Sequence, residues 1–524
     1  MKVFNNMYDK NKYIMLKNDI LQIGGSHFLK MYHHNILDKD LGNNMEPWFF
    51  YQNYPFIIMI NGISYTVTSE ISELLSDLIQ SMWTLKNSGS QRILQSPSKC
   101  IKESSDQTIE QSIKQQELWG LYFARFLDND FKDITIDDAT KQIINKKLME
   151  LQKLLIIGAH IDKLHFFKEF VKSFFLKINE YNKHFEWKNR KPKLLELILT
   201  SGCDVISLVE ANEEFALIFL ETKHPDSWKY LYIPNKKFNL RTKTYEDQSF
   251  GNILIINMAI YDIIDSHSRY FYTNEENLRC YLMVILCNKV LDINILVVTT
   301  HLTKDEKNLN NEIARTREIE KLLQEINKQI KYLEYEEQMI VKKLEFLEYE
   351  KQTIDKKTAM LDDEIKNIDK KEIKKLDKLN KEKKELDKEK QKLYTEKQQL
   401  DAEKKKKKYD LIIICGDFNS CLKKDCLICD GKCQDITHVT DIFKQNSYEY
   451  NNDDNSCSTI TLRRKALIDN IAVKKINNTR KINVSHKVIH REYCAKDSHK
   501  IIPDDIIPSD HLPIMLTLEI NYTR

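Results

Sequence analysis

The segment from Lys304 to Lys408 constrains the fold of this chain most, because it contains no glycine or proline and repeats its apolar residues every seven positions. The repeated residues are Ile326, Leu333, Ile340, Leu347, Ile354 and Leu361, and after a shift of phase Leu379, Leu386, Leu393 and Leu400. Lysine and glutamate fill most positions between them. This spacing predicts a coiled coil, with a single solvated charged helix as the alternative.

The two ends of this segment join apolar runs, Ile293 to His301 and Tyr409 to Gly416, that read as buried strands. One straight helix of this length would extend on the order of 150 Å at about 1.5 Å per residue. Such a helix would separate the two strands, whose polar ends are expected at one site. We therefore expect an antiparallel helical hairpin that turns between Asp355 and Lys371, projects from the domain and binds a protein partner.

Other short apolar runs rich in β-branched residues also predict strands. They are Phe28 to Leu37, Cys203 to Glu210, Gly251 to Ile263, Arg279 to Cys287, Ala466 to Val473 and Leu512 to Ile520. A second interruption, residues 38–180, contains an aromatic patch from Trp48 to Phe56, a polar stretch over 86–116 and helical periodicity over 138–180. We expect this insertion to be partly disordered and partly helical. Without it and the 304–408 insertion, residues 20–37, 181–302 and 409–522 suit one domain.

Composition excludes little about partners. The 524 residues carry a formal net charge of only +3, so a basic surface for nucleic acid would have to be local. No apolar run approaches the roughly 20 residues that span a bilayer, and the N-terminus lacks a signal-peptide core. We expect a soluble cytoplasmic protein whose cysteines are reduced thiols or metal ligands rather than a disulfide framework, or a nuclear protein if Lys404 to Lys408 serves as an import signal.

Two motifs indicate chemistry. Gly416-Asp417-Phe418-Asn419-Ser420 follows an apolar strand, and Asp510-His511 precedes another. Asp417 and Asn419 are two residues apart at a strand end and therefore point to the same side, where they can orient or deprotonate a water. Such groups suit water attack on phosphorus beside a hard cation.

The order of motifs along the chain resembles the endonuclease/exonuclease/phosphatase superfamily, and within it the deadenylase-like branch that includes carbon-catabolite-repression deadenylases, nocturnin, Angel proteins and 2′,5′-phosphodiesterases. The motifs are Asn35-Ile36-Leu37, Trp187 to Pro192, Asp204 to Glu210, Thr299 to Leu302, Gly416 to Ser420, Leu467 to Asp469 and Pro508 to Pro513. The resemblance implies an α/β fold, a four-layer α/β/β/α sandwich of two mixed sheets, here with a long antiparallel helical hairpin (coiled coil) inserted. It also implies divalent-metal phosphoester hydrolysis.

The resemblance assigns metal binding to Glu210 and Asn35, and the metal to Mg²⁺ or Mn²⁺, which prefer such oxygen ligands. His33 or His34 could instead be the group that matters near Asn35.

By the same carry-over, Asp417 and Asn419 act on the water. His511, oriented by Asp510, and His301 donate to phosphate oxygens that gain charge in the transition state, and Asp469 completes the polar floor of the site.

The substrate is inferred from departures from the family pattern. Members that bind adenine place an aromatic ring where this chain reads Leu462-Arg463-Arg464-Lys465, so Arg463 and Arg464 are the candidate substrate-binding residues, stacking on a base or binding phosphate.

We expect a 3′-5′ exoribonuclease acting on RNA. A lipid or inositol phosphoesterase of the same fold, of 5-phosphatase or sphingomyelinase type, is the alternative, although those phosphatases usually read Gly-Asp-Leu-Asn. A catalytically weak scaffold acting through its coiled coil is the second alternative.

Four cysteines follow the Gly416 to Ser420 motif, at Cys421, Cys426, Cys429 and Cys433. Their spacing differs from the two close pairs of most zinc sites, so we expect free thiols, with a structural Zn²⁺ site as the alternative.

Overall fold

The computed structural model describes much of the chain, including both of the sheets that the motifs predict. The described residues are 26–37, 39, 56–68, 70–71, 74–75, 77–78, 137–155, 162–182, 184–223, 225–273, 277–304, 309–367, 373–406, 409–420, 438–453, 456–461, 464–476, 481–495 and 502–521. Within these parts, no helix combines the length and the apolar composition needed to cross a bilayer.

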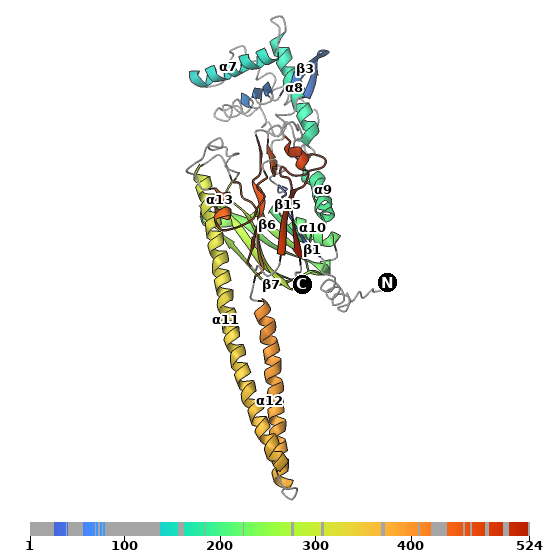
Figure 1. Cartoon of the computed structure of the whole chain (residues 1–524). Helices are drawn as coiled ribbons and strands as arrows, with labels where there is room; N and C mark the ends of the chain where they lie inside the picture. Colours follow the sequence, from blue (N-terminus) through green and yellow to red (C-terminus); the bar gives the residue numbers. More distant parts are fainter. Residues whose placement is uncertain are drawn as a thin grey trace, which may run out of the picture.

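Two mixed β-sheets form the centre of the molecule (Figure 1). The larger has the order β15-β16-β1-β4-β6-β5-β8, and the smaller β14-β11-β10-β9-β7. Their strands are β1 (Ser26–Asn35), β4 (Val205–Ala211), β5 (Trp228–Asn239), β6 (Thr244–Asn257), β7 (Tyr261–Tyr270), β8 (Asn277–Leu278), β9 (Cys280–Asn288), β10 (Ile293–His301), β11 (Leu411–Asp417), β14 (Asp469–Lys475), β15 (Lys481–Val488) and β16 (Ile514–Asn521). The pairs β1–β4 and β10–β11 are parallel, and the others are antiparallel. The expectation of an α/β chain with mixed sheets is confirmed.

Apolar side chains from both sheets share one buried cluster, which includes Met31, Leu254, Val297 and Ile413. Helices cover the outer faces. On the larger sheet lie α9 (Trp187–Thr200) and α10 (Glu213–Thr222), and on the smaller sheet lie the start of α11 (Leu309–Asn367) and α13 (Val439–Gln445). The resulting order of layers is helix, sheet, sheet, helix.

The predicted strand from Gly251 to Ile263 is wrong as a single element. The chain turns after Asn257 and returns as β7 in the other sheet. Asn257 makes this turn: its Oδ1 accepts from Ala259 N at 3.1 Å and its carbonyl accepts from Ile260 N at 3.1 Å. Because Met258, Ala259 and Ile260 are apolar, the hydrophobic pattern continues through the turn and hides it.

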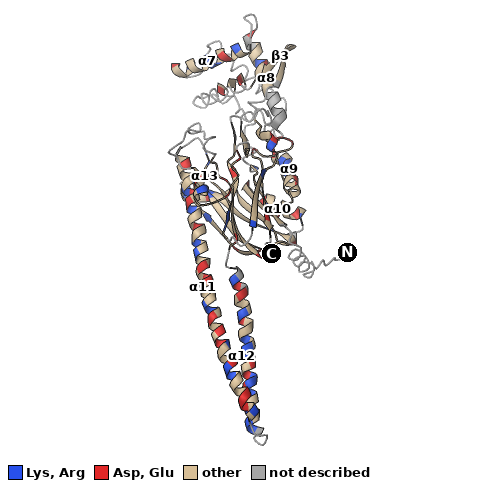
Figure 2. Cartoon of the chain, in the orientation of Figure 1, with Lys and Arg blue, Asp and Glu red and all other residues tan. Residues whose placement is uncertain are grey.

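Residues 304–408 contain two helices, α11 and α12 (Ile373–Lys406), which extend away from the sheets (Figure 1). Ion pairs join Glu348 to Lys397, Asp355 to Lys390 and Asp362 to Lys383, so the helices run antiparallel. Blue (Lys, Arg) and red (Asp, Glu) residues recur along the whole length of both helices (Figure 2). Helix α11 continues to Asn367, near the end of the range where the sequence predicts a turn, and residues 368–372 lie outside the described residues.

The 38–180 interruption contributes a hairpin of β2 (Phe56–Ile60) and β3 (Ile63–Val67) and the helices α7 (Asp138–Leu154) and α8 (Lys163–Asn182). In Figure 1 these elements lie at the opposite end of the sheets from the tip of the α11–α12 pair. Residues 48–55 of the aromatic patch and the polar stretch 86–116 lie outside the described residues.

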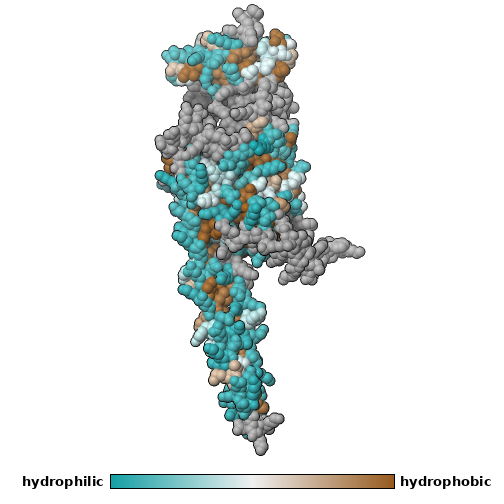
Figure 3. Space-filling model, in the orientation of Figure 1, coloured by the Kyte–Doolittle hydropathy of each residue, from teal (hydrophilic) through white to brown (hydrophobic). Residues whose placement is uncertain are grey.

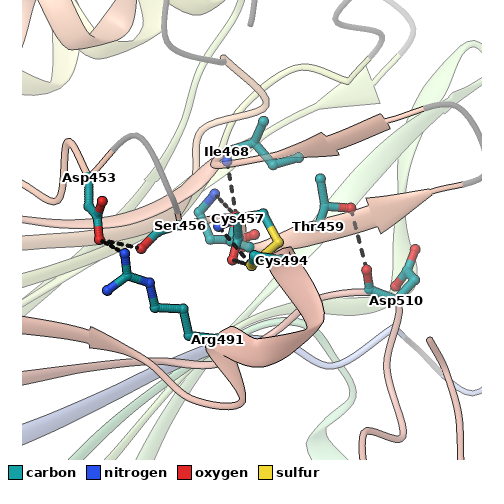
Figure 4. The surroundings of a disulfide bond; sticks show 10 residues. Asp453, Ser456, Cys457, Thr459, Ile468, Arg491, Cys494 and Asp510 are labelled. Carbon is teal, nitrogen blue, oxygen red and sulfur yellow. Dashed lines mark hydrogen bonds and ion pairs between the residues drawn. A yellow bond between two sulfur atoms is a disulfide. The ribbon is translucent and has the colours of Figure 1, made fainter. Parts of the chain in front are cut away.

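A disulfide joins Cys457 to Cys494 (Figure 4). The expectation of reduced thiols is therefore wrong for this pair, since the fold brings two cysteines 37 residues apart to a Cα–Cα distance of 5.5 Å. Cys203, Cys280, Cys287 and Cys415 are free. Cys421, Cys426, Cys429 and Cys433 lie outside the described residues, so the zinc alternative has no structural test.

Candidate active site

Polar residues from strand ends of both sheets meet in one buried cluster. The register pairs His301 at the end of β10 with Asp417 at the end of β11, and Asp417 with Asp469 at the start of β14. The larger sheet adds Asn35 at the end of β1 and Glu210 in β4. The exposed fractions of the cluster are 1% for Asn35, 2% for Glu210, 0% for His301, 1% for Asp417, 1% for Asp469 and 6% for His511. Burying six polar groups together costs free energy unless they are hydrogen-bonded or paired with opposite charge.

Asp417 lies at the centre of the cluster. Asn35 Nδ2 donates to its Oδ2 at 3.0 Å, and the backbone N–H of Asn419 donates to its Oδ1 at 2.9 Å. His301 Nε2 lies 3.6 Å and His511 Nε2 4.0 Å from Oδ2. Burial, with the nearby Asp469 carboxylate, raises the pKa of Asp417 to about 7. A carboxyl with such a pKa can accept and release a proton near neutral pH.

Gly416 allows β11 to place Asp417 beside β10. A Cβ at this position would lie 2.7 Å from the carbonyl oxygen of Thr300 and 2.8 Å from a ring carbon of Phe418. Only glycine avoids this overlap with the backbone of the neighbouring strand. The glycine of the motif is thus explained by packing rather than by chemistry.

Asp469 and His511 form a close pair. His511 Nδ1 lies 2.6 Å from Asp469 Oδ2, and the other carboxylate oxygen lies 3.5 Å from His33 Nε2. Burial lowers the pKa of His511, but Asp469 and Asp510 outweigh it and raise the pKa to about 10. Burial raises the pKa of Asp469, but the charge of His511 outweighs it and the net direction is down. His511 is thus held as an imidazolium whose Nε2 faces Asp417.

Asp510 was expected to orient His511, but the hydrogen bond to His511 Nδ1 comes from Asp469. The carboxyl of Asp510 accepts from Ser509 Oγ at 3.5 Å and acts on His511 through its charge. Sequence alone could not distinguish the two carboxylates, because Asp510 is adjacent to His511 in the chain whereas Asp469 is brought to it by the fold. His33, the option left open beside Asn35, accompanies the pair, and its Nδ1 lies 3.0 Å from Ser207 Oγ.

Glu210 and His301 form the other side of the cluster. Glu210 makes an ion pair with Lys304, and its Oε1 lies 4.0 Å from His301 Nε2. Burial raises the pKa of Glu210, but Lys304 outweighs it and the net direction is down, so the carboxylate is charged. Burial and the Arg279 guanidinium hold the pKa of His301 well below its usual range. His301 is therefore a neutral imidazole, and neither ring nitrogen has a hydrogen-bond partner among the described residues.

Glu210 and Asn419 have backbone φ angles of 50° and 49°. Residues other than glycine rarely adopt this left-handed conformation, which costs of order 1–3 kcal/mol and clusters at functional sites. In β4 the irregularity lies between Leu208 and Ala211 and turns Glu210 out of the regular ladder. The strain therefore coincides with two of the residues that the motifs selected.

A divalent cation fits one side of the cluster better than the other. Glu210 offers a buried, charged carboxylate whose Oε1 already pairs with the cationic Nζ of Lys304, so a positive charge is accommodated at this oxygen. Asp417, Asp469 and His511 also have potential ligand atoms within 4.8 Å of one another. However, the Nδ1 of His511 is committed to Asp469, and an imidazolium has no free lone pair for a metal. We therefore favour Glu210 as the principal ligand.

Asn35 presents a donor rather than an oxygen to the site. Its Nδ2 faces Asp417, and its Oδ1 accepts from Leu37 N at 3.1 Å. An oxygen from Asn35 can reach a cation only after its amide rotates.

A second buried polar network, at the base of α11, was missed by the sequence analysis. Glu312, Arg315 and Glu318 are buried to 2%, 0% and 0% exposed, although they belong to a charged helix. Glu318 accepts from Thr303 N at 2.9 Å and from Thr303 Oγ1 at 2.6 Å, and Arg315 donates to the carbonyl of Thr303 at 3.0 Å. These bonds fix the segment between His301 and Lys304.

Glu312 extends this network to the Gly416 to Ser420 motif. Its Oε1 accepts from Ser420 Oγ at 2.7 Å and lies 3.0 Å from His438 Nδ1, while Arg315 pairs with its other oxygen. Asn419, next to Ser420, donates from Nδ2 to the carbonyl of Leu302 at 3.1 Å. The sequence signal was weak: three charges at i, i+3 and i+6 share one helix face, but they look like the solvated charges around them.

Arg190 supports the cluster from the larger sheet. Its buried guanidinium donates to four backbone carbonyls, those of Phe185 at 3.0 Å, Ile36 at 3.1 Å, Leu37 at 2.8 Å and Pro508 at 3.1 Å. It thus joins the chain that follows Asn35 to the chain that precedes His511. The sequence motif from Trp187 to Pro192 contained Arg190, but nothing in it showed this role.

One of the two candidate substrate-binding arginines belongs to the described backbone. Arg463 lies outside the described residues, and Arg464 begins the short strand β13 (Arg464–Ala466), which pairs with β12 (Thr459–Thr461). Thr459 of β12 also forms an isolated bridge with His511. The backbone that carries Arg464 is therefore connected to the candidate site through one strand.

No protein-family model matches the sequence, and no curated protein matches it. Among solved structures, the chain is similar to the catalytic domain of human nocturnin with bound sulfate, at 14% identity and a TM-score of 0.36 over 64% of this chain and 88% of that one. It is similar to ANGEL2, a 2′,3′-cyclic phosphatase in complex with adenosine-2′,3′-vanadate, at 13% identity and a TM-score of 0.36 over 65% of this chain and 88% of that one. It is also similar to TDP2 from C. elegans, at 10% identity and a TM-score of 0.33 over 80% of this chain and 97% of that one.

Proposed function

We propose that this chain is a divalent-metal-dependent phosphodiesterase, and more specifically a 3′-5′ exoribonuclease of the deadenylase-like type. The observation that carries the proposal is the buried cluster in which His301 and His511 both face Asp417, with Glu210 beside them. Hydrolysis of a phosphodiester needs a base for water, donors for the phosphate oxygens and compensation of charge. The cluster offers a group for each need.

Glu210 would hold the cation, with Asn35 as a second ligand, and Mg²⁺ or Mn²⁺ is the expected ion. When bound, the cation supplies Lewis-acid stabilisation of charge on the phosphate oxygens.

The protein's own groups account for proton transfer and orientation. Asp417, with its pKa raised to about 7, accepts the proton of the attacking water. The backbone N–H of Asn419 fixes the rotamer of Asp417. His511, fixed by Asp469, donates from Nε2 to a phosphate oxygen, and neutral His301 donates a second hydrogen bond.

RNA as the substrate is supported by the sequence motifs and by the two arginines that follow β12. Arg463 and Arg464 would stack on a base or bind phosphate near the 3′ end. We also propose that α11 and α12 act as a coiled coil that binds a protein partner.

The test is hydrolysis by the purified full chain. Oligoribonucleotides labelled at the 5′ or 3′ end, phosphoinositides and sphingomyelin are incubated with Mg²⁺ or Mn²⁺, with and without EDTA. The proposal predicts stepwise shortening of 5′-labelled RNA that EDTA abolishes. Turnover confined to the lipids would favour the lipid phosphoesterase, and no turnover of any substrate would favour the scaffold.

A further inference from the structure

Beyond the sheets, α11 carries a row of exposed apolar side chains that its contacts with α12 do not cover. These residues, here called the outer stripe, are Tyr332 at 56% exposed, Tyr335 at 60%, Met339 at 49%, Phe346 at 57%, Tyr349 at 69% and Met360 at 71%. In Figure 3, brown patches interrupt the hydrophilic surface of the helix pair. Large apolar side chains gathered on one helix face mark an interaction surface.

The outer stripe lies on the far side of α11 from α12. The seam that faces α12 contains Ile340, Leu347 and Ile354, which are 8%, 4% and 7% exposed. At about 100° of rotation per residue, positions such as Phe346 and Tyr349 lie away from this seam by more than a right angle. The two apolar faces therefore serve different partners.

The spacing of the outer stripe selects a helix as its partner. Tyr332, Met339, Phe346 and Met360 are separated by multiples of seven residues, and Tyr335 and Tyr349 each follow a member of that series by three. Alternation of three and four residues is the knobs-into-holes pattern of two packed helices. The pattern is interrupted at Lys342 and again at Thr353 and Lys356, so its apolar positions are densest from Tyr332 to Tyr349.

The charges beside the outer stripe select a second copy of this chain. Glu336, Lys343, Glu350, Lys357 and Glu364 alternate in sign at seven-residue intervals, and Lys343 also pairs with Glu396 of α12 at 3.1 Å. A parallel pair of copies brings identical residues, and so like charges, to the same level. An antiparallel pair with its two-fold axis between Phe346 and Tyr349 brings Glu336 within two residues of the level of Lys357, and Lys343 within two residues of the level of Glu350. The same alignment places Phe346 against Tyr349 of the other copy.

We propose that two copies of this chain associate antiparallel through the outer stripes of their α11 helices. The overlap from Lys328 to Asn367 is about 60 Å long at about 1.5 Å per residue. The two sheet cores then lie at opposite ends of the assembly. The partner's helix tip has room at the base of α11, because Lys328 is 70% exposed there while Ile326 faces the sheets.

The first test is the mass of the full chain in solution, which does not depend on any enzymatic activity. Sedimentation equilibrium at tens of micromolar should give a dimer, since a coiled-coil interface of this length reaches micromolar affinity or better. A Phe346→Glu/Tyr349→Glu variant should be a monomer with unchanged helix content by circular dichroism. A monomeric wild-type chain would overturn the proposal and leave the outer stripe to a helix of another protein.

The second test addresses the antiparallel alignment. Glu336→Lys and Lys357→Glu should each weaken the dimer about tenfold, because each creates two facing like-charge pairs. Mixing the two variants should restore wild-type affinity as a heterodimer, since the introduced lysine of one copy then faces the introduced glutamate of the other. Glu334→Lys, an exposed change of the same charge away from the outer stripe, is the matched control and should dimerise normally. Failure of the mixture to recover affinity would rule out this alignment.

Discussion

The two ends of α11 place the same kinds of residue in opposite environments. At its base, Glu312, Arg315 and Glu318 are buried and hydrogen-bonded to the segments that flank the candidate site. Farther along, Glu348 and Lys397 pair on a surface where both side chains are well exposed, at 38% and 40%. Buried ion pairs with full hydrogen bonding are costly to disrupt, whereas exposed pairs contribute little.

This difference shows that the inserted helix is not one functional unit. Ile319, Leu322 and Ile326 near its base pack against the smaller sheet. Ile340 and Leu347, farther along, pack with Leu400 of α12. The first part of α11 is therefore a layer of the core, and only the remainder is an arm.

Two deletions, one that includes the base of α11 and one confined to the arm, should show the largest difference in stability. Removing 306–407 should unfold the protein, because losing several buried residues at roughly 2–5 kcal/mol each exceeds a typical stability of about 5–15 kcal/mol. Replacing 341–399 with a short Gly/Ser linker should leave melting temperature and hydrolysis unchanged, since Ile340 and Leu400 lie together. Thermal melts of both proteins test this, and equal stability would show that the base is dispensable.

Within the core, Asp417→Ala and His511→Ala should each lower the rate of RNA hydrolysis by roughly 10² to 10⁴ with the fold intact. His486→Ala, a partly buried histidine of β15 that bonds the carbonyl of Ile471, is the matched control and should retain activity. Single-turnover rates provide the measurement. Wild-type rates in either site variant would refute its assigned role.

The base network should respond to loss of a single charge. Glu312→Gln should lower the free energy of unfolding by about 3 kcal/mol, because it leaves the buried Arg315 without its carboxylate. Glu348→Gln, the same change in the arm, should have no measurable effect. Urea denaturation of the two variants compares base with arm directly, and similar midpoints would contradict the distinction.

Acid should produce the smallest of these effects. Burial raises the pKa of Glu312, but the hydrogen bond with His438 and the charge of Arg315 outweigh it, so the folded-state pKa is below the ordinary value of 4.5. The contribution of this carboxylate is thus complete above that value and is lost as the pH falls through the lower, folded-state pKa. The stability gap between wild type and Glu312→Gln should narrow over that range. If the difference in stability between wild type and Glu312→Gln widened as the pH falls, the pKa of Glu312 would be raised in the folded protein rather than lowered.

Much of the site could be predicted from the sequence because its residues lie at strand ends. The apolar runs before His301, Glu210 and Asp417 identify β10, β4 and β11, and a member of the cluster lies at or near the end of each strand. A local sequence pattern is sufficient to find these site residues, because they lie where the apolar strands end.

The remaining features depend on contacts between distant segments. The Asp469–His511 pair spans 42 residues and the Glu312–Ser420 bond 108 residues. A buried glutamate on a charged helix has the same sequence pattern as a solvated one, so Glu312 and Glu318 gave no signal. The Cys457–Cys494 disulfide escaped prediction for the same reason.

The four carbonyl contacts of Arg190 have an evolutionary consequence. Every residue type carries a carbonyl, so substitutions at positions 36, 37, 185 and 508 can accumulate without depriving the guanidinium of acceptors. Only the arginine itself is irreplaceable, since lysine offers a single ammonium where a planar fork of donors is used. Position 190 should therefore tolerate substitution far less than positions 36, 37, 185 and 508.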